Sequence, residues 1–241
     1  MGQERIIHAA LLGAGTVGSG VYKLVKDLEE EIISKTGARL VVDKILVRDT
    51  TKAREGIPSE LLIDRWDEIL NDPQIEIVIE VMGGIRPALT WLEEALRAGK
   101  QVVTANKDLL AEYGEQLFDA AEAGKCDLHF EAAVAGAIPI IRPLRQSLVA
   151  SELTEVMGIV NGTTNYILTR MTEDGMGYEE ALALATKLGY AESDPTADVE
   201  GYDAGRKVAI MASIAFNSNV TFSQVYTEGI THITAEDIRY A

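Results

Sequence analysis

The chain has 241 residues, of which 47% are hydrophobic and 25% charged, so it is long enough for one large or two modest domains with real cores. A formal net charge of −16 argues against nucleic acid and anionic membranes as partners. With one cysteine, Cys126, a polar start and no apolar run long enough to span a bilayer, the sequence fits a cytoplasmic protein without a disulfide.

A glycine-rich turn follows the first predicted strand. Residues 6–12 (IIHAALL) form a short apolar run that is typical of a buried parallel strand. Residues 13–18 (GAGTVG) then match the G-x-G-x-x-G spacing, and apolar residues recur at helical spacing over 17–33. The order of strand, glycine turn and helix predicts a dinucleotide-binding site.

Each glycine of this turn has a distinct predicted role. Gly13 permits the tight turn, Gly15 lets the backbone approach a pyrophosphate, and Gly18 lets the helix pack on the strand. Thr16 and Val17 belong to the same expected cofactor site, because the helix N-terminus presents unpaired N–H groups to phosphates.

Strand and helix continue to alternate through the first half of the chain. Further strands are expected at residues 39–47, 75–81, 101–104 and 127–132, and helices at 60–70, 87–98 and 108–123. This alternation predicts an α/β fold with a Rossmann-type, doubly wound parallel sheet covered by helices on both faces. Ligands bind such sheets at the carboxyl ends of the strands.

The pattern changes after Gly136, where we place a domain boundary. The expected elements beyond it are a connecting helix at 138–149, a strand at 152–160, and helices at 163–171, 178–188 and 203–216. We therefore expect a dinucleotide-binding domain at residues 1–136 and a second, smaller α+β domain for substrate binding and dimerisation at 137–241.

Cofactor preference depends on the residues after the second predicted strand. An acidic residue there would bind the ribose hydroxyls of NAD, whereas an arginine would accept the 2′-phosphate of NADP. Arg48 and Asp49 stand side by side at this point, with more basic residues following. We favour NADP, with use of both cofactors left open.

Asp203 and Lys207 are four residues apart in a predicted helix, which puts them on one face. A lysine beside a carboxylate can serve as a proton donor. Such a pair is more commonly a solvated surface ion pair of little consequence. The spacing alone therefore does not decide between the two.

Three longer segments resemble homoserine dehydrogenases. They are VVTANKDLLAEYG (102–114), NGTTNYILTRM (161–171) and ALATKLGYAESDPTADVEGYDAGRK (183–207). The last matches the family pattern A-x-x-x-G…D-P-x-x-D-[apolar]-x-G-x-D-x-x-x-K from Ala185 to Lys207 without a departure. The resemblance implies reversible NAD(P)H-dependent reduction of L-aspartate 4-semialdehyde to L-homoserine, in threonine, methionine and isoleucine biosynthesis, by a homodimer.

The resemblance also implies a role for each matching polar residue. Lys207 would give a proton to the developing alkoxide, and Asp203 would bind substrate and orient that lysine. Glu192 would bind the substrate's amino group, with Asp198 as a supporting polar group. Lys107 would stand at the nicotinamide end of the cleft, as both a catalytic and a cofactor-binding residue.

Further contacts follow from the same resemblance. Thr104 and Gly189 correspond to cofactor contacts. A sodium ion would be held by the Glu131 carboxylate and three main-chain carbonyls, those of Val134, Gly136 and Ile138. Carbonyl and carboxylate oxygens suit such a hard cation; a loop with a half-buried glutamate is the plainer alternative.

Homoserine dehydrogenases normally continue past the equivalent of Ala241, with strands that return to the nucleotide domain. We therefore expect a catalytic core without that segment. The alternatives are another amino-acid dehydrogenase of similar architecture and a non-catalytic dinucleotide-binding protein. Aspartate-semialdehyde dehydrogenase is disfavoured because its thioester chemistry needs a nucleophilic cysteine, and Cys126 lies at a predicted strand away from these motifs.

Overall fold

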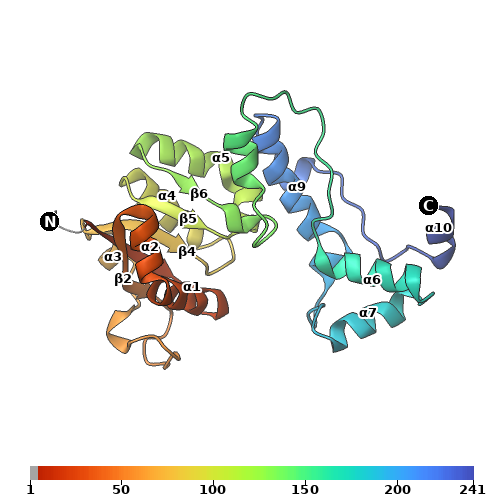
Figure 1. The fold of residues 1–241 in the computed structure, drawn as a ribbon, viewed down its shortest axis with the longest axis horizontal. Helices are drawn as coiled ribbons and strands as arrows, with labels where there is room; N and C mark the ends of the chain where they lie inside the picture. The colour runs from red at the N-terminus through yellow and green to blue at the C-terminus, as the bar shows by residue number, and fades with distance from the viewer. Residues whose placement is uncertain (1–4) are drawn as a thin grey trace. The chain divides into compact units, whose positions relative to one another are not determined.

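A computed structural model describes residues 5–241 (Figure 1). The chain divides into two compact units, the first ending at Ile138 and the second running from Pro139 to Ala241. Compactness does not reveal what each unit binds, so the functional assignment of residues 1–136 and 137–241 remains a prediction. None of the helices within residues 5–241 combines the length and the apolar character that a membrane crossing requires.

The first unit is built on a six-stranded sheet with the order β3-β2-β1-β4-β5-β6. Its strands are β1 (Arg5–Leu12), β2 (Ala38–Leu46), β3 (Leu62–Ile63), β4 (Ile75–Glu80), β5 (Gln101–Thr104) and β6 (Leu128–His129). All neighbouring strands run parallel. The chain starts at β1 and builds outward first to one side and then to the other, which places a topological switch point between β1 and β4. The predicted α/β, doubly wound sheet is confirmed.

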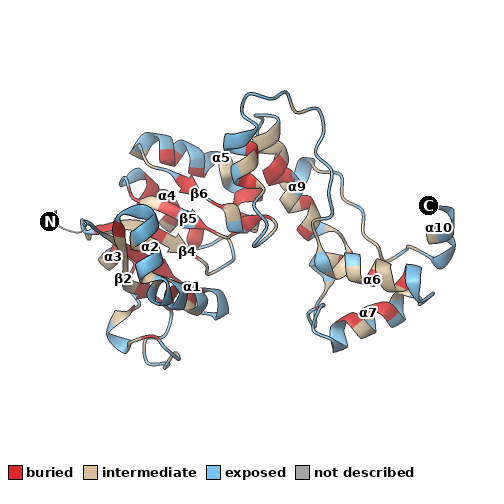
Figure 2. Cartoon of the chain, in the orientation of Figure 1, coloured by how far each residue is buried: buried red, intermediate tan, exposed pale blue. Residues whose placement is uncertain are grey.

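Helices connect these strands. They are α1 (Thr16–Asp27), α2 (Glu29–Thr36), α3 (Asp67–Leu70), α4 (Ala88–Arg97) and α5 (Lys107–Gly124). Helix α4 buries Leu89, Leu92 and Leu96 almost completely, at the spacing of one helical face. In Figure 2 most residues of the strands are buried or intermediate, whereas α1 and α2 are mostly exposed.

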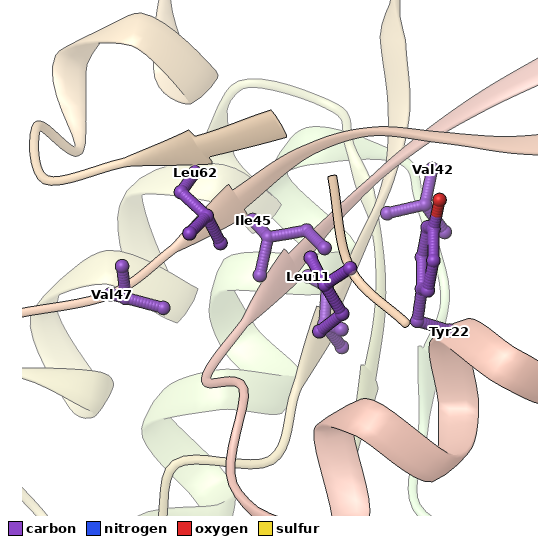
Figure 3. Close-up of a cluster of buried hydrophobic side chains, with 7 residues drawn as sticks. Leu11, Tyr22, Val42, Ile45, Val47 and Leu62 are labelled. Carbon is purple, nitrogen blue, oxygen red and sulfur yellow. The ribbon is translucent and has the colours of Figure 1, made fainter. Parts of the chain in front are cut away.

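One core cluster packs the start of the sheet against α1 and the segment before β3. It contains Leu11, Tyr22, Val42, Ile45, Val47, Ile57 and Leu62 (Figure 3). Burial of each large apolar side chain contributes roughly 1.5–3 kcal/mol. This packing holds the carboxyl ends of β1 and β2 together at the edge where ligands bind such sheets.

The second unit is helical wherever its described residues have regular structure. Its elements are a π-helical turn η3 (Pro143–Ser147), α6 (Gly162–Glu173), α7 (Tyr178–Lys187), α8 (Thr196–Val199), α9 (Tyr202–Ala215), a 3-10 turn η4 (Phe222–Gln224) and α10 (Ala235–Tyr240). A separate core cluster, centred on Ile167, Met171 and Ala185, joins α6 and α7.

Several expected elements differ from the structure. The strand expected at 127–132 covers only Leu128–His129, and the connecting helix expected at 138–149 is helical only over 141–147. The strand predicted at 152–160 is wrong, because this segment has no regular secondary structure and pairs with no strand in the described chain, and Met157 is 84% exposed. The second unit therefore lacks the strand behind its α+β assignment. The single helix predicted at 17–33 is interrupted at Leu28, which has φ −108° and ψ 23°.

The helix predicted at 60–70 is mostly wrong as well. It starts as a 3-10 turn, η1 (Ser59–Leu61), and continues as the edge strand β3, so only Asp67–Leu70 is helical. Leu62 and Ile63 pair with Ile45 and Leu46 of β2, and this long-range pairing overrides the local helical spacing.

Candidate functional site

The glycine turn after β1 fits a phosphate-binding loop. Gly13 has φ +100°, and a Cβ there would lie 3.0 Å from Met82 Cγ and 3.2 Å from the Val81 carbonyl oxygen. A Cβ on Gly18 would lie 2.1 Å from the Gly13 carbonyl oxygen, so only glycine lets α1 pack against the turn. Gly15 has open space on its Cβ side, where a ligand could approach the backbone.

Helix α1 begins directly at this turn. Gly15 is its N-cap, and no side chain caps the first N–H groups. Thr16 and Val17, in its first turn, are exposed. Because uncapped N–H groups at a helix N-terminus carry partial positive charge, this end can bind a phosphate.

Two charged residues follow β2: the Asp49 carboxylate is hydrogen-bonded within the loop, whereas the Arg48 guanidinium is not. The Asp49 carboxylate accepts hydrogen bonds from the Thr51 hydroxyl (2.6 Å) and the Thr51 N–H (2.9 Å), which lowers the pKa of Asp49. Arg54 donates to the main-chain carbonyls of Asp49 and Lys52. Arg48 is exposed and makes no hydrogen bond or ion pair with any described residue. Its guanidinium is therefore available to an anion.

A buried hydrogen-bond network lies at the carboxyl ends of β4 and β5. Glu80, the last residue of β4, is 0% exposed. One of its oxygens accepts from the N–H groups of Met82 (2.8 Å) and Gly83 (3.2 Å). The other accepts from the Thr104 hydroxyl at 2.6 Å. Thr104 itself is 1% exposed, so its hydroxyl serves this network.

The same network reaches the start of α5. The N–H of Asn106 donates to the Thr104 hydroxyl oxygen at 3.0 Å, and the Asn106 side-chain amide donates to the carbonyl of Gly84 at 2.6 Å. The Asn106 side-chain oxygen caps α5 by accepting from the N–H of Leu109. Lys107 follows as the first residue of α5 and is half-buried.

In the second unit, Asp203 and Lys207 form a mostly buried ion pair. Lys207 Nζ donates to Asp203 Oδ2 and to the carbonyl of Val160, both at 2.6 Å. The side chains are 16% exposed for Lys207 and 10% for Asp203. Asn161 joins this pair to Asp198, because its amide donates to Asp198 Oδ1 (2.7 Å) and Asp203 Oδ2 (2.9 Å). Burial and added hydrogen bonds distinguish this arrangement from a solvated surface pair.

Asn161 is a site residue that the sequence reasoning did not single out. It caps α6, since its side-chain oxygen accepts from the N–H of Thr164 at 2.8 Å. Its amide therefore fixes the two aspartates relative to the start of α6. The available signal was an asparagine directly before a Gly-Thr-Thr helix start, where an N-cap is expected.

The remaining predicted residues of the second unit lie outside this network. Gly189 has φ +80° and ends α7, where its N–H donates to the carbonyl of Thr186. Glu192 is exposed, and its carboxylate accepts no hydrogen bond from the described part of the chain. A carboxylate in this position can bind a ligand without first breaking an internal contact.

The expected sodium loop has an unusual backbone. Glu131 is half-buried and begins a 3-10 turn, η2 (Glu131–Ala133). Ala135 (φ 50°) and Ala137 (φ 67°) are both left-handed, which costs roughly 1–2 kcal/mol for each non-glycine residue. A carboxylate with nearby carbonyl oxygens is chemically suited to a hard cation. Over residues 5–241, no group of three His, Cys, Asp or Glu side chains could hold a metal ion.

Two family models together match most of the chain. Residues 13–131 match the NAD binding domain of homoserine dehydrogenase, and residues 139–241 match the homoserine dehydrogenase domain. The homoserine dehydrogenase of Corynebacterium glutamicum is 51% identical over 240 residues, which are 100% of this chain and 54% of that protein. That of Bacillus subtilis is 47% identical over 98% of this chain and 55% of the relative. The chain thus spans about half the length of these relatives.

Solved structures agree with these matches. A homoserine dehydrogenase from Thiobacillus denitrificans superposes with a TM-score of 0.91 at 44% identity, over 98% of this chain and 55% of that one. A putative homoserine dehydrogenase from Archaeoglobus fulgidus has a TM-score of 0.83 at 33% identity, over 97% of this chain and 76% of that one. By sequence and by fold alike, the chain belongs to the homoserine dehydrogenase family.

Proposed function

We propose that this chain carries the cofactor-binding and catalytic residues for the interconversion of L-aspartate 4-semialdehyde and L-homoserine with NAD(P)(H). The single observation that carries the proposal is the buried Asp203–Lys207 pair, held by Asn161. In this proposal, the first domain (1–136) binds the dinucleotide. The second (137–241) binds the substrate and forms the interface of a cytoplasmic homodimer.

The chemistry follows from the residues around Lys207. When bound, the reduced nicotinamide supplies a hydride to the aldehyde carbon, and the carbonyl electron pair moves to oxygen. Lys207 Nζ stabilises the resulting alkoxide and gives it a proton. Asp203 orients Nζ through its 2.6 Å hydrogen bond. In the reverse direction, Lys207 accepts the hydroxyl proton of homoserine.

The other site residues complete the proposal. Glu192 pairs with the substrate's ammonium group, and Asp198 supports Asp203 through Asn161. Lys107, the first residue of α5, binds the nicotinamide end of the cofactor. A further cofactor contact comes from the backbone at Gly189.

NADP is the proposed preferred cofactor. Arg48 is exposed and available to a 2′-phosphate, whereas Asp49 Oδ1 already accepts two hydrogen bonds from Thr51, which leaves mainly Oδ2 for ribose hydroxyls. A hyperthermophilic archaeal homoserine dehydrogenase that shares the fold, at 24% identity, was solved in complex with NADPH. NAD remains the alternative cofactor.

A sodium ion is also proposed, held by the Glu131 carboxylate and the carbonyls of Val134, Gly136 and Ile138. Left-handed Ala135 and Ala137 alternate with these donors, and strained backbone of this kind accompanies ligand sites. Bound there, the ion would offset the repulsion among the donor oxygens and rigidify the loop. A rise in melting temperature with sodium but not with lithium, lost in Glu131→Gln, would support this.

The decisive experiment is oxidation of L-homoserine, followed by NADPH absorbance, beside a titration of NADPH binding on the same protein. Turnover that requires both L-homoserine and NADP supports the proposal. Binding of NADPH without turnover would indicate a non-catalytic dinucleotide-binding protein. Turnover of other amino acids in preference to homoserine would indicate a different amino-acid dehydrogenase.

A further inference from the structure

Glu80 is a fully buried acid whose bonds go to loops at the ligand-binding edge of the sheet. It lies at the switch point, where its strand neighbours are Leu12 of β1 and Thr104 of β5. Burying a carboxyl group is costly unless it is hydrogen-bonded. An apolar side chain would be enough for strand packing, and the other two buried positions of β4 are indeed occupied by Ile75 and Val78. The acid therefore calls for a reason beyond packing.

The first loop that Glu80 holds is the one following its own strand. Its Oε1 gathers the N–H groups of Met82 and Gly83 into a tight turn, and Gly83 and Gly84 continue with φ values of 73° and 74°. This loop backs onto the glycine turn, since Met82 leaves no room for a Cβ on Gly13. A Cβ added to Gly83 or Gly84 would have no protein atom within 4 Å, so a ligand can reach the backbone of both residues.

The second structure that Glu80 holds is the start of α5. Through the Thr104 hydroxyl and Asn106, its carboxylate is connected to the carbonyl of Gly84 and to the capped first turn that begins at Lys107. All three direct contacts of Glu80 are donations to its oxygens, which an ionised carboxylate accepts without conflict. One buried group thus fixes two neighbouring loops relative to each other.

We propose that Glu80 is a positioning residue for the nicotinamide half of the cofactor, acting through the loop 82–84 and the start of α5. In a doubly wound sheet the adenosine half lies over the side of β1 and β2, where Arg48 follows, and the other half lies over the side of β4 to β6. Glu80 sits under this second side. The inference rests on the proposed dinucleotide binding and adds the group that shapes half of that site.

The test is Glu80→Gln in the whole chain, with titrations of NADPH and of 2′-phospho-ADP-ribose, which lacks the nicotinamide. A glutamine must turn an NH₂ group toward a donor: either toward the N–H groups of Met82 and Gly83, or toward the Thr104 hydroxyl, which then loses its acceptor. We expect NADPH to bind about tenfold more weakly, which corresponds to about 1.4 kcal/mol, and 2′-phospho-ADP-ribose to bind within about twofold of the parent.

Three further variants separate positioning from mere stability. Asp72→Asn changes another hydrogen-bonded acid, just before the start of β4. It should lower the melting temperature without changing the ratio of the NADPH affinity to the 2′-phospho-ADP-ribose affinity. Thr104→Val removes the hydroxyl and should reproduce Glu80→Gln, whereas Thr104→Ser should restore most of the lost affinity. These Thr104 variants also keep the test decisive if Glu80→Gln does not fold.

The outcomes are distinct. Equal weakening of both ligands, or no weakening in a folded Glu80→Gln or Thr104→Val protein, overturns the positioning role while leaving dinucleotide binding intact. If Thr104→Ser does not restore NADPH affinity, the hydrogen bond from the Thr104 hydroxyl to Glu80 does not position the cofactor. That result would also overturn the positioning role. A parent protein that binds neither ligand refutes the proposed function itself, and the inference with it.

Discussion

Lys207 and Asp203 show how burial changes the meaning of a common sequence spacing. On a solvated helix face such a pair contributes about 0.3–0.5 kcal/mol. Here the lysine also donates to the carbonyl of Val160, and the aspartate also accepts from Asn161. The ammonium group is held in one place by partners from separate segments, which is what a positioned proton donor needs.

Replacing Lys207 should therefore remove chemistry and spare cofactor binding. We expect Lys207→Ala to lower the turnover of homoserine by about 10²–10⁴-fold, as for the loss of a general acid, with the Kd for NADPH within about twofold. Lys187→Ala, at an exposed lysine of α7, is the control. Near-normal turnover of Lys207→Ala would exclude it from the mechanism. If the parent chain is inactive, the comparison is made in a chain extended to the length of its relatives.

Arg48 offers a prediction about cofactor choice. Its guanidinium is exposed after β2, so Arg48→Ala should weaken NADPH binding by about ten- to a hundredfold, as expected for a charge-assisted contact of about 1.5–3 kcal/mol. NADH binding should hardly change. The control is Arg65→Ala, at an exposed arginine that pairs with Glu68. An equal loss for both cofactors would mean that Arg48 supports the loop or the shared part of the dinucleotide.

Glu192 should affect substrate affinity. A substrate ammonium group loses water on binding, and a carboxylate is its natural partner. Glu192→Gln should therefore raise KM for homoserine by at least about tenfold and reduce discrimination against analogues that lack the amino group. Glu180→Gln makes the same charge change at an exposed glutamate of α7. If KM and discrimination both stay unchanged, Glu192 is simply one of the solvated acids of a very acidic chain.

Among the helices and strands, local patterns predicted what local chemistry determines. The glycine turn could be predicted because Gly13 has φ +100° and a Cβ on Gly18 would meet the nearby carbonyl of Gly13, both of which are local requirements. The edge strand β3 was not, because Leu62 and Ile63 are defined by pairing with β2. The segment 152–160 has strand-like spacing, but spacing cannot supply a partner strand.

The same distinction applies to the site. Asp203 and Lys207 are close in sequence, so their contact could be anticipated. Glu80 and Thr104 are 24 residues apart, and Asn161 and Asp203 are 42 apart, so their hydrogen bonds depend on the completed fold. A single acid ending an apolar strand before two glycines was the one available sign of Glu80.

The segment just before β4 gives a prediction about the stability of the fold at acidic pH. Asp72 accepts from Lys44 Nζ at 2.7 Å and from the N–H of Gln74, and the hydrogen bond from Lys44 lowers the pKa of Asp72. A carboxyl whose pKa is lower in the folded state stabilises the fold above its unfolded pKa, and this contribution is lost as the pH falls through the folded value. Asp72→Asn should thus lower the free energy of unfolding at pH 7.

The pH dependence checks the cause. As the pH falls below about 4, the parent should lose stability faster than Asp72→Asn, so that their urea midpoints converge. Asp119→Asn, at an exposed aspartate of α5, is the control and should track the parent. A constant difference between Asp72→Asn and the parent at every pH would mean that the ion pair with Lys44 is not its source.

Within residues 5–241, each of the two units has a buried hydrophobic cluster of its own. One packs the sheet of the first unit around Leu11 and Ile45, and the other joins α6 and α7 around Ile167. Both tryptophans, Trp66 and Trp91, lie in the first unit, where their rings stack 5.6 Å apart. Tryptophan fluorescence therefore reports the unfolding of the first unit, whereas far-ultraviolet circular dichroism reports helices of both.

This difference allows ligand binding to be assigned to one unit. A ligand at 100 times its Kd stabilises the folded state that binds it by about 2.7 kcal/mol. NADPH at that level should raise the fluorescence midpoint by several degrees. It should shift the part of the dichroism transition that comes from α6, α7 and α9 by less, because Gly189 is the one cofactor contact proposed for the second unit. Adenosine, which lacks the phosphates, serves as the control. A single transition that NADPH shifts equally in both signals would show that the two units unfold together, and an unshifted fluorescence midpoint would remove the cofactor from the first unit.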